Sequence, residues 1–190
     1  MGTRDRILDA AAEIMRNRGV VHATTKEIAR AAGFSEAALY KHFSDKEDLI
    51  LNVLRHRMPG PAGAWPEPGA ATVPANLTAI ARSALEFYRQ SLPLLGGLLA
   101  QPQRLAAHRD SMSKHGAGPG RAIAGIAGYL RAEQELGRVA ADADVDAVAA
   151  LLDGACFHQA FLRFYEAGPD AEPAPEELAG ALAGALARGL

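Results

Sequence analysis

The chain is poor in cysteine, in aromatic residues and in net charge. Among its 190 residues there is one cysteine, Cys156, which excludes an intrachain disulfide and suits a reducing compartment. Aromatic residues make up only 6%. The formal net charge is −2, so the chain as a whole is not a basic nucleic-acid-binding protein. No apolar run approaches the ~20 residues that a bilayer requires, and the charged N-terminus is unlike a signal peptide. We therefore expect a cytoplasmic protein with no membrane partner.

What the chain does contain is enough apolar material for an ordinary core. Hydrophobic residues make up 49% and charged residues 22%, which excludes a wholly disordered chain. The charge is unevenly spread: residues 1–58 carry ten Lys/Arg against eight Asp/Glu, and the remainder carries ten against fourteen. A mildly basic head on an acidic body permits local contact with phosphates, although so small an asymmetry decides nothing alone.

Apolar residues recur at helical spacing almost throughout, so the expected fold class is all-α. Proline and glycine gather in residues 59–74, which predicts a loop there. This loop divides the chain into a helical head at 1–58 and a larger helical body at 75–190. The expected helices of the body cover residues 75–92, 94–100, a weak segment to 114, then 121–136, 145–167 and 175–190.

The head shows the start and stop signals of four short helices. The first runs over residues 3–18 and is expected to stop at Gly19. Thr24, with Glu27 three residues on, would cap the second as a capping box, and Thr25 is the near alternative. Ser35 caps a third over residues 36–43, and Ser44 or Asp45 caps a fourth.

The second and third helices, joined by residues 33–35, have the dimensions of a helix-turn-helix, in which the second helix enters the major groove. Eight residues at 1.5 Å each give a rod of ~12 Å, about the width of that groove. Leu39 and Phe43 should point inward, which leaves Glu36, Ala37, Tyr40 and Lys41 facing outward.

These residues resemble a known family. The segment Thr25-Lys26-Glu27-Ile28-Ala29-Arg30-Ala31-Ala32-Gly33-Phe34-Ser35, then Glu36-Ala37-Ala38-Leu39-Tyr40-Lys41-His42-Phe43 and Asp45-Lys46-Glu47-Asp48-Leu49, resembles the DNA-binding signature of the TetR (tetracycline repressor-like) transcription regulators. The resemblance covers roughly residues 4–54. Phe34 departs from it, because the family more often has valine there. The resemblance implies a regulator, more commonly a repressor, that binds double-stranded operator DNA as a homodimer and responds to a small molecule. It makes residues 1–58 the helix-turn-helix DNA-binding domain and residues 75–190 the helical effector-binding and dimerisation domain.

The resemblance also implies roles for the head's polar residues. Tyr40 and Lys46 are expected to contact phosphates, and His42 the DNA backbone, with packing against the first helix as its alternative. Thr25 and Ser35 can each cap a helix or contact a phosphate. The base edges are assigned to Lys41 for guanine, Glu36 for a cytosine amine and Ala37 for a thymine methyl. Lys26 and Arg30 are as readily explained as a solvated face.

One recognition helix reads only a few base pairs, so affinity and specificity for DNA require two heads and hence a dimer. The helix expected over 145–167 offers a surface for it, because it is apolar on two sides. One stripe contains Val148, Leu152, Cys156 and Gln159; the other contains Leu151, His158, Phe161 and Tyr165. Together with Leu178, Leu182 and Leu186 of the last helix, the first stripe is our expected dimer interface, in line with the resemblance. The alternative is a thick monomer core.

An effector pocket should use large or polar residues on otherwise apolar faces, and the effector should be small and apolar with polar tips. The candidates are Phe87, Tyr88, His108, Tyr129, Phe157 and Phe161, for each of which a plain core role is the alternative. Trp65 could act as a lid or be merely exposed.

No catalytic residue, metal site or cofactor is expected. Asp142, Asp144 and Asp146 imitate a calcium loop, but Ala147 stands where the required glycine should be. Cys156 is expected to be buried and inert, with redox sensing a minor option. An enzyme, or a DNA-packaging protein without effector control, each with a helix-turn-helix-like head, remain the rival interpretations.

Overall fold

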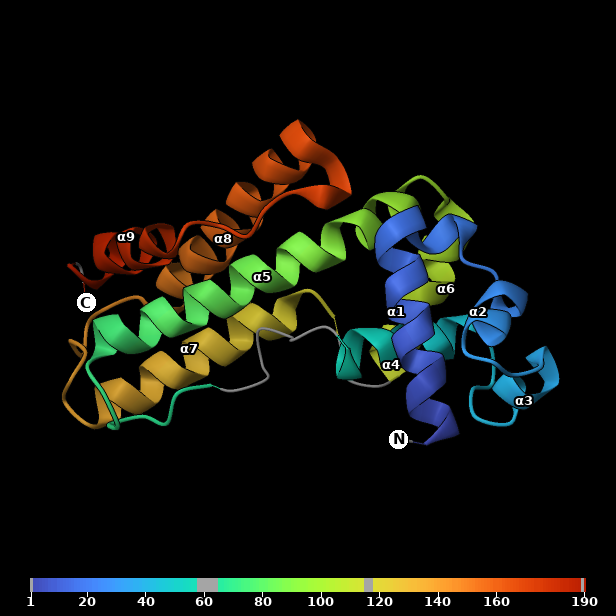
Figure 1. Ribbon diagram of the computed structural model, residues 1–190. Coiled ribbons are helices and arrows are strands. Elements are labelled where there is room, and N and C mark those ends of the chain that lie inside the picture. Colours follow the sequence, from blue (N-terminus) through green and yellow to red (C-terminus); the bar gives the residue numbers. More distant parts are fainter. Residues whose placement is uncertain (1, 58–64, 115–117, 189) are drawn as a thin grey trace. The chain divides into compact units, whose positions relative to one another are not determined.

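The computed structural model describes residues 2–57, 65–114, 118–188 and 190, and these residues form helices with no strand among them (Figure 1). In chain order the elements are α1 (Thr3–His22), α2 (Thr25–Ala31), α3 (Glu36–Tyr40), α4 (Lys46–His56), α5 (Val73–Leu99), α6 (Pro102–Lys114), α7 (Gly120–Glu135), α8 (Val145–Ala167), the 3-10 helix η1 (Gly168–Asp170) and α9 (Glu176–Ala187). The expected all-α class is confirmed.

The chain divides into two compact units. The first contains Met1–Pro59 and Gln90–Gly118; the second contains Gly60–Arg89 and Pro119–Leu190. The boundary crosses α5, so the end of α5 and all of α6 belong with the head, where α6 packs against α4. The packed units therefore do not have the boundaries that the sequence indicates at residues 59–74. The division into two functional domains there stays a prediction.

The head is built around α1. Ile7, Leu8 and Met15 are fully buried on one face of α1, as the periodicity predicts, and α1 contacts both α2 and α4. Two charged residues tie its first turns to α4: Arg57 Nη2 lies 2.9 Å from Asp5 Oδ1, and Arg57 Nε lies 2.5 Å from Asp9 Oδ1. This guanidinium holds the pKa of Asp5 below its usual value through the hydrogen bond that it donates.

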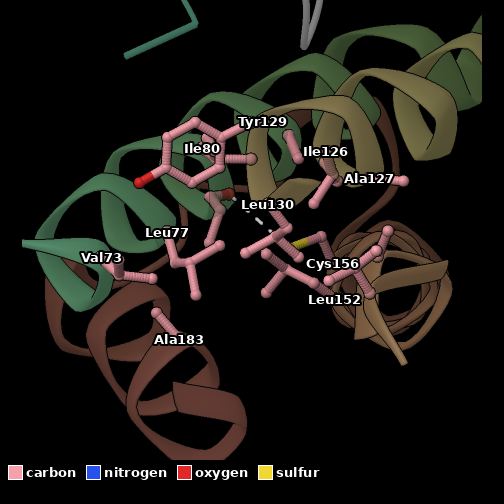
Figure 2. Packing of buried hydrophobic residues seen from close by; sticks show 14 of the residues in the cluster. Val73, Leu77, Ile80, Ile126, Ala127, Tyr129, Leu130, Leu152, Cys156 and Ala183 are labelled. Atoms are coloured by element: carbon pink, nitrogen blue, oxygen red, sulfur yellow. Dashed lines mark hydrogen bonds between the residues drawn. The ribbon is translucent and has the colours of Figure 1, made fainter. Parts of the chain in front are cut away.

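The core of the second unit is formed by α5, α7, α8 and α9. Figure 2 shows Leu77 and Ile80 of α5 beside Leu130 of α7 and Leu152 of α8, all of them buried. The thiol of Cys156 lies in the same cluster and donates to the carbonyl oxygen of Ala81 at 3.7 Å (Figure 2). The expectation of a buried cysteine is confirmed, and burial raises the pKa of its thiol to about 12.

Several boundaries differ from expectation. The first helix continues past Gly19 to His22, and α3 ends at Tyr40 rather than residue 43, although the backbone turns once more and Phe43 N–H donates to Leu39 C=O. The expected start of a new helix after Pro93, to which a kink was the alternative, is wrong: α5 is one helix of 27 residues with Pro93 inside it. The long helix over 145–167 is confirmed as predicted.

One described segment, Val145–Asp170, is long and apolar enough by length and composition to cross a membrane, and an 18-residue window within it has a mean hydropathy of 1.3. This corrects the expectation that no run approaches that length. The segment includes the buried carboxylate Asp153, and its buried face packs in the core of the second unit, as the core helix of a globular fold does.

Residues 65–72, here called the strap, lie along α7 in the second unit. The ring of Trp65 packs where Gly125 has no side chain: a Cβ on Gly125 would lie 2.6 Å from Trp65 Cζ2. Further on, Gly69 N–H donates to Glu133 Oε1 at 3.2 Å, and Arg138 donates to the carbonyl oxygen of Ala71. Trp65 is thus a partly buried packing residue of this unit, which excludes the expectation that it is merely exposed.

Candidate nucleic-acid interface

The polar residues expected to contact DNA lie on α2, α3 and the start of α4, and local hydrogen bonds position these helices. Thr24 Oγ1 accepts from Glu27 N–H at 3.2 Å, so Thr24 is the cap of α2. The Glu27 carboxylate does not complete a capping box; it accepts from Arg18 Nη1 at 2.8 Å. Thr25 is thereby left out of capping, and its hydroxyl serves another contact.

The turn between α2 and α3 follows the expected pattern. Gly33 has φ +79°, a conformation that favours glycine, and it ends α2. The guanidinium of Arg6 lies 4.8 Å from the centre of the Phe34 ring, so the larger side chain at this position packs against α1. Ser35 Oγ accepts from Ala38 N–H at 3.2 Å, which assigns the serine its capping role.

Thr25, Glu36 and Tyr40 come together across the two helices. Thr25 Oγ1 donates to Glu36 Oε1 at 2.5 Å and lies 3.3 Å from Tyr40 Oη. Tyr40 is 46% exposed, so its phenol lies at the surface of the head. We call these three side chains the hydroxyl–carboxylate network.

The remaining residues expected at DNA lie on α3, in the turn that follows it and at the start of α4. Ala37, Lys41 and His42 are exposed, and Lys46 is half-buried in the first turn of α4. Exposure of His42 disfavours the alternative of packing against α1. Asp45 caps α4 by accepting from Asp48 N–H at 2.7 Å, which decides between the two caps expected there.

Sequence reasoning missed the side chains that hold the head together. Arg4 Nη2 donates to Asn52 Oδ1 at 2.5 Å, and the Arg4 guanidinium lies 5.3 Å from the centre of the Phe43 ring. Arg4 and Asn52 are 48 residues apart in the chain, and neither has a local pattern that marks it. Such long-range pairs are found only once the helices are packed.

In the second unit, part of the expected effector site comes together. The Tyr88 ring stands edge-on to Phe87 and to Phe157, with ring centres 5.3 Å apart in both pairs. The Tyr88 hydroxyl donates to Asp153 Oδ1 at 2.8 Å, and burial raises the pKa values of both groups. Asp153 was not expected here, because an acidic residue on an apolar helix carries no sign of its partner.

The other expected effector residues lie elsewhere. Tyr129 is buried in the core, which raises the pKa of its phenol to about 12 (Figure 2). Phe161 is exposed, and His108 belongs to the first unit, where burial lowers its pKa. A pocket of about 250 Å³ beside α9 contains none of the six; its lining is Arg82, Leu85, Glu86, Pro173, Ala174, Pro175, Glu176 and Ala179.

The expected dimer stripe requires a correction. Leu152 and Cys156 are fully buried against α5 and α7, so they form core and no exposed surface. Val148, Leu178, Leu182 and Leu186 are partly buried against the same core, and Gln159 is half-buried. The opposite stripe of α8 is open: Leu151 is 60% exposed and Tyr165 is 79% exposed.

The acidic residues that imitate a calcium loop have structural partners. Asp144 caps α8 by accepting from Ala147 N–H at 3.0 Å, and Asp146 accepts from Arg131 Nη2 at 2.6 Å. Among the described residues, no group of three or more His, Cys, Asp or Glu side chains is placed to hold a metal ion.

Comparison with known proteins matches the head to a family. Residues 7–53 match the model of "Bacterial regulatory proteins, tetR family". Over 55 residues the chain is 46% identical to the uncharacterized HTH-type transcriptional regulator TtgW of Pseudomonas putida, covering 29% of this chain and 41% of that one. The HTH-type transcriptional repressor KstR2 of Rhodococcus jostii is 41% identical over 54 residues, with 28% and 26% covered. The nucleoid occlusion factor SlmA of Aliivibrio fischeri is 50% identical over 52 residues, with 27% and 26% covered.

The match to these relatives is confined to less than half of their length. The whole fold, by contrast, is similar to solved structures. A TetR-family regulator of Mesorhizobium loti has a TM-score of 0.70 at 20% identity, covering 98% of this chain and 93% of that one. The regulator FadR of Bacillus subtilis, solved in complex with stearoyl-CoA, has a TM-score of 0.67 at 16% identity, covering 98% of both chains. At these identities the likeness shows the fold alone.

Proposed function

We propose that the chain is a member of the TetR family, whose model its residues 7–53 match, and that it regulates transcription by binding palindromic operator DNA as a homodimer from which a small apolar effector releases it. The observation that carries this proposal is the surface of the head. The hydroxyl–carboxylate network and the exposed Lys41 and His42, which follow Tyr40 in the chain, all lie within the segment that matches the family. In this proposal the chain is a transcriptional regulator, as its relatives and structural neighbours are named, and not an enzyme. Repression is the mode that we propose, and the cytoplasm, where DNA is reached, is the proposed location.

In the proposed complex, hydroxyls and cations contact the DNA backbone and a few side chains contact bases. Tyr40, Thr25, His42 and Lys46 contact phosphates, and Ser35 adds a contact only if its hydroxyl can serve both cap and phosphate. Lys41 donates to a guanine edge, Glu36 accepts from a cytosine amine and Ala37 packs on a thymine methyl.

The shortness of α3 supports a limited base readout. Five residues at 1.5 Å each give a rod of ~7.5 Å, shorter than the ~12 Å width of the groove. A single head therefore reads few base pairs, so a useful specificity requires two heads on two half-sites. The proposed second copy packs through the exposed stripe of α8, with α9 beside it.

The proposed effector site is the aromatic cluster of Phe87, Tyr88 and Phe157, where the Tyr88–Asp153 pair supplies a polar tip. An effector can only release the DNA if it binds the DNA-incompetent arrangement more tightly than the other. His108, Tyr129 and Phe161 remain candidates of lower rank, because they lie outside this cluster.

Selection of bound fragments from a pool of random duplexes tests the proposal. We expect enrichment of a palindrome with half-sites about one helical turn, ~34–36 Å, or a multiple apart, with binding that weakens as salt rises. A panel of small apolar compounds should then contain a compound that releases the operator. Long-chain acyl-CoA, which is larger and charged, is tested beside the panel because a structural neighbour was solved with stearoyl-CoA.

The alternative is a helical enzyme or a DNA-associated structural protein without effector control. The match of the head to a nucleoid occlusion factor gives the second of these some support. Retention of the operator in the presence of every compound, together with binding sites spread over the genome rather than at promoters, would favour that alternative.

A further inference from the structure

Glu36 accepts a hydrogen bond from the Thr25 hydroxyl, which the proposed function needs as a donor to a DNA phosphate. Thr25 opens α2, but the cap is made by Thr24, so the Thr25 hydroxyl is directed to α3. It donates to Glu36 Oε1 at 2.5 Å. A threonine hydroxyl has one proton, so it can donate to the carboxylate or to a phosphate but not to both.

The same carboxylate lies beside the second hydroxyl of the network. Glu36 and Tyr40 are four residues apart on α3 and therefore share a helix face, and Tyr40 Oη lies 3.3 Å from Thr25 Oγ1. An ionised carboxylate only accepts hydrogen bonds, and its charge repels a phosphate that approaches these hydroxyls. With Glu36 in this position, the head is poorly suited to the backbone of an arbitrary duplex.

We propose that Glu36 is a specificity-determining residue that couples base recognition to phosphate contact. On DNA without a suitable base, Glu36 continues to accept the hydrogen bond from Thr25, and its charge repels the DNA phosphates. On the operator, the carboxylate moves to accept a hydrogen bond from a cytosine amine, and the hydroxyls of Thr25 and Tyr40 become donors to phosphates. The inference depends on the proposed operator binding and adds to it that Glu36 lowers the affinity for non-specific DNA.

Two features of the site support this exchange. Ser35, next to Glu36 in the chain, accepts from Ala38 N–H with its hydroxyl oxygen, and the hydrogen bond described for the Glu36 carboxylate comes from Thr25. The network is also part-exposed and involves side chains alone, so that its rearrangement leaves α2 and α3 intact.

The experiment compares Glu36→Gln with the unmodified protein on the selected operator and on a scrambled duplex of the same length and composition. The glutamine side-chain oxygen can still accept from Thr25, but it has no charge. We expect binding to the scrambled duplex to become several-fold tighter and binding to the operator to be equal or weaker, so that the ratio of the two affinities falls about tenfold. Glu13→Gln is the matched control, since Glu13 is an exposed carboxylate on α1 outside the network, and it should leave the ratio unchanged.

A double-mutant cycle then tests the shared proton. Thr25→Val removes the donor at similar size, and its effect on binding to the scrambled duplex should differ at least threefold between the unmodified background and a Glu36→Ala background, in which the acceptor is removed. Additive effects, or an equal change on both duplexes in Glu36→Gln, would overturn the inference. Failure of the unmodified protein to select any operator would instead overturn the proposed function. Thermal unfolding of each variant verifies that the head is folded.

Discussion

Asp153 is a carboxylate buried on the apolar helix α8, and its one described hydrogen-bond partner is the hydroxyl of Tyr88. Removal from water disfavours the charged form and raises the pKa of Asp153 above its ordinary value of 3.8. Asp153 therefore binds its proton more tightly in the folded than in the unfolded chain. Its contribution to the free energy of unfolding is fully present below the pKa of the unfolded chain and is lost as pH rises through the pKa of the folded chain. At neutral pH this carboxylate therefore costs the fold free energy, and a role in binding would explain why it is retained.

Asp153→Asn tests this cost. The asparagine oxygen can still accept from Tyr88, while the charge is gone, so we expect the free energy of unfolding at pH 7 to increase by about 1 kcal/mol. The gain should shrink toward pH 4 and below, where the carboxylate of the unmodified protein is protonated. Urea unfolding at several pH values measures it. Tyr88→Phe is the control in the opposite direction: it leaves the carboxylate without this donor and should destabilise. A gain independent of pH would contradict the assignment.

Cys156 offers a second test at the same scale. Its thiol is buried and has a pKa of about 12, so little reactive thiolate is present at pH 8. We expect alkylation by iodoacetamide to be at least about a hundredfold slower in the native protein than in urea, because reaction requires transient opening of the core. Rapid labelling of the native protein would instead favour the redox-sensing role.

At the scale of helices, the strap packs closely against α7 because α7 has a glycine at the point of contact. Gly125 lies under the ring of Trp65, which is the one tryptophan of the chain, whereas a Cβ on Gly128 of the same helix would meet nothing within 4 Å. The two glycines therefore form a natural pair of sites with the same helix propensity and different surroundings.

Gly125→Ala should displace the indole, because the new methyl group would lie 2.6 Å from Trp65 Cζ2. The gain of roughly 0.5–1 kcal/mol from replacing a helical glycine should be offset, and the tryptophan emission should shift to longer wavelength. Gly128→Ala should keep that gain and leave the emission unchanged. Identical emission spectra and equal stabilities of the two variants would contradict the position of Trp65 on α7.

Helices are also the scale at which sequence reasoning succeeded and failed. Caps are local, so Thr24, Ser35 and Asp45 could be found from their own hydroxyl or carboxylate groups and the residues that follow. Stop signals were less reliable: α1 passes Gly19, and α5 passes Pro93, because packing along a whole helix outweighs one unfavourable residue. The outward residues of α3 followed from spacing, but the hydrogen bond from Thr25 to Glu36 did not, since it needs the packed angle between two helices.

For the body, periodicity found both apolar stripes of α8 but could not decide which one faces inward. The stripe of Leu152 and Cys156 is buried against α5 and α7, and the stripe of Leu151 and Tyr165 is exposed. Both stripes are similarly apolar, so only the position of the neighbouring helices distinguishes them. This is why Leu152 and Cys156, which are core residues, were expected at the dimer interface.

For the whole molecule, the open stripe of α8 is the surface on which the proposed homodimer depends. Large apolar residues that stay exposed along one helix mark an interaction site. Phe161 and Leu162, which lie between Leu151 and Tyr165 in the chain, are also exposed and belong to this stripe. Two heads joined in this way bind two half-sites at once, so that loss of the dimer should cost far more affinity than loss of any single contact in one head.

Leu151→Glu places a charge in the middle of that surface, where burial in a dimer would leave it without a partner. We expect light scattering after size-exclusion chromatography to give a monomer, and affinity for the operator to fall at least about a hundredfold. The helical content should be unchanged, because Leu151 does not contribute to the core of its own unit. Leu136→Glu is the matched control: Leu136 is similarly exposed, at 55%, but lies after the end of α7, and this variant should remain a dimer with full affinity. A Leu151→Glu protein that stays dimeric would move the interface to another face, and an unmodified protein that is a stable monomer would remove the two-headed binding on which the proposed operator recognition depends.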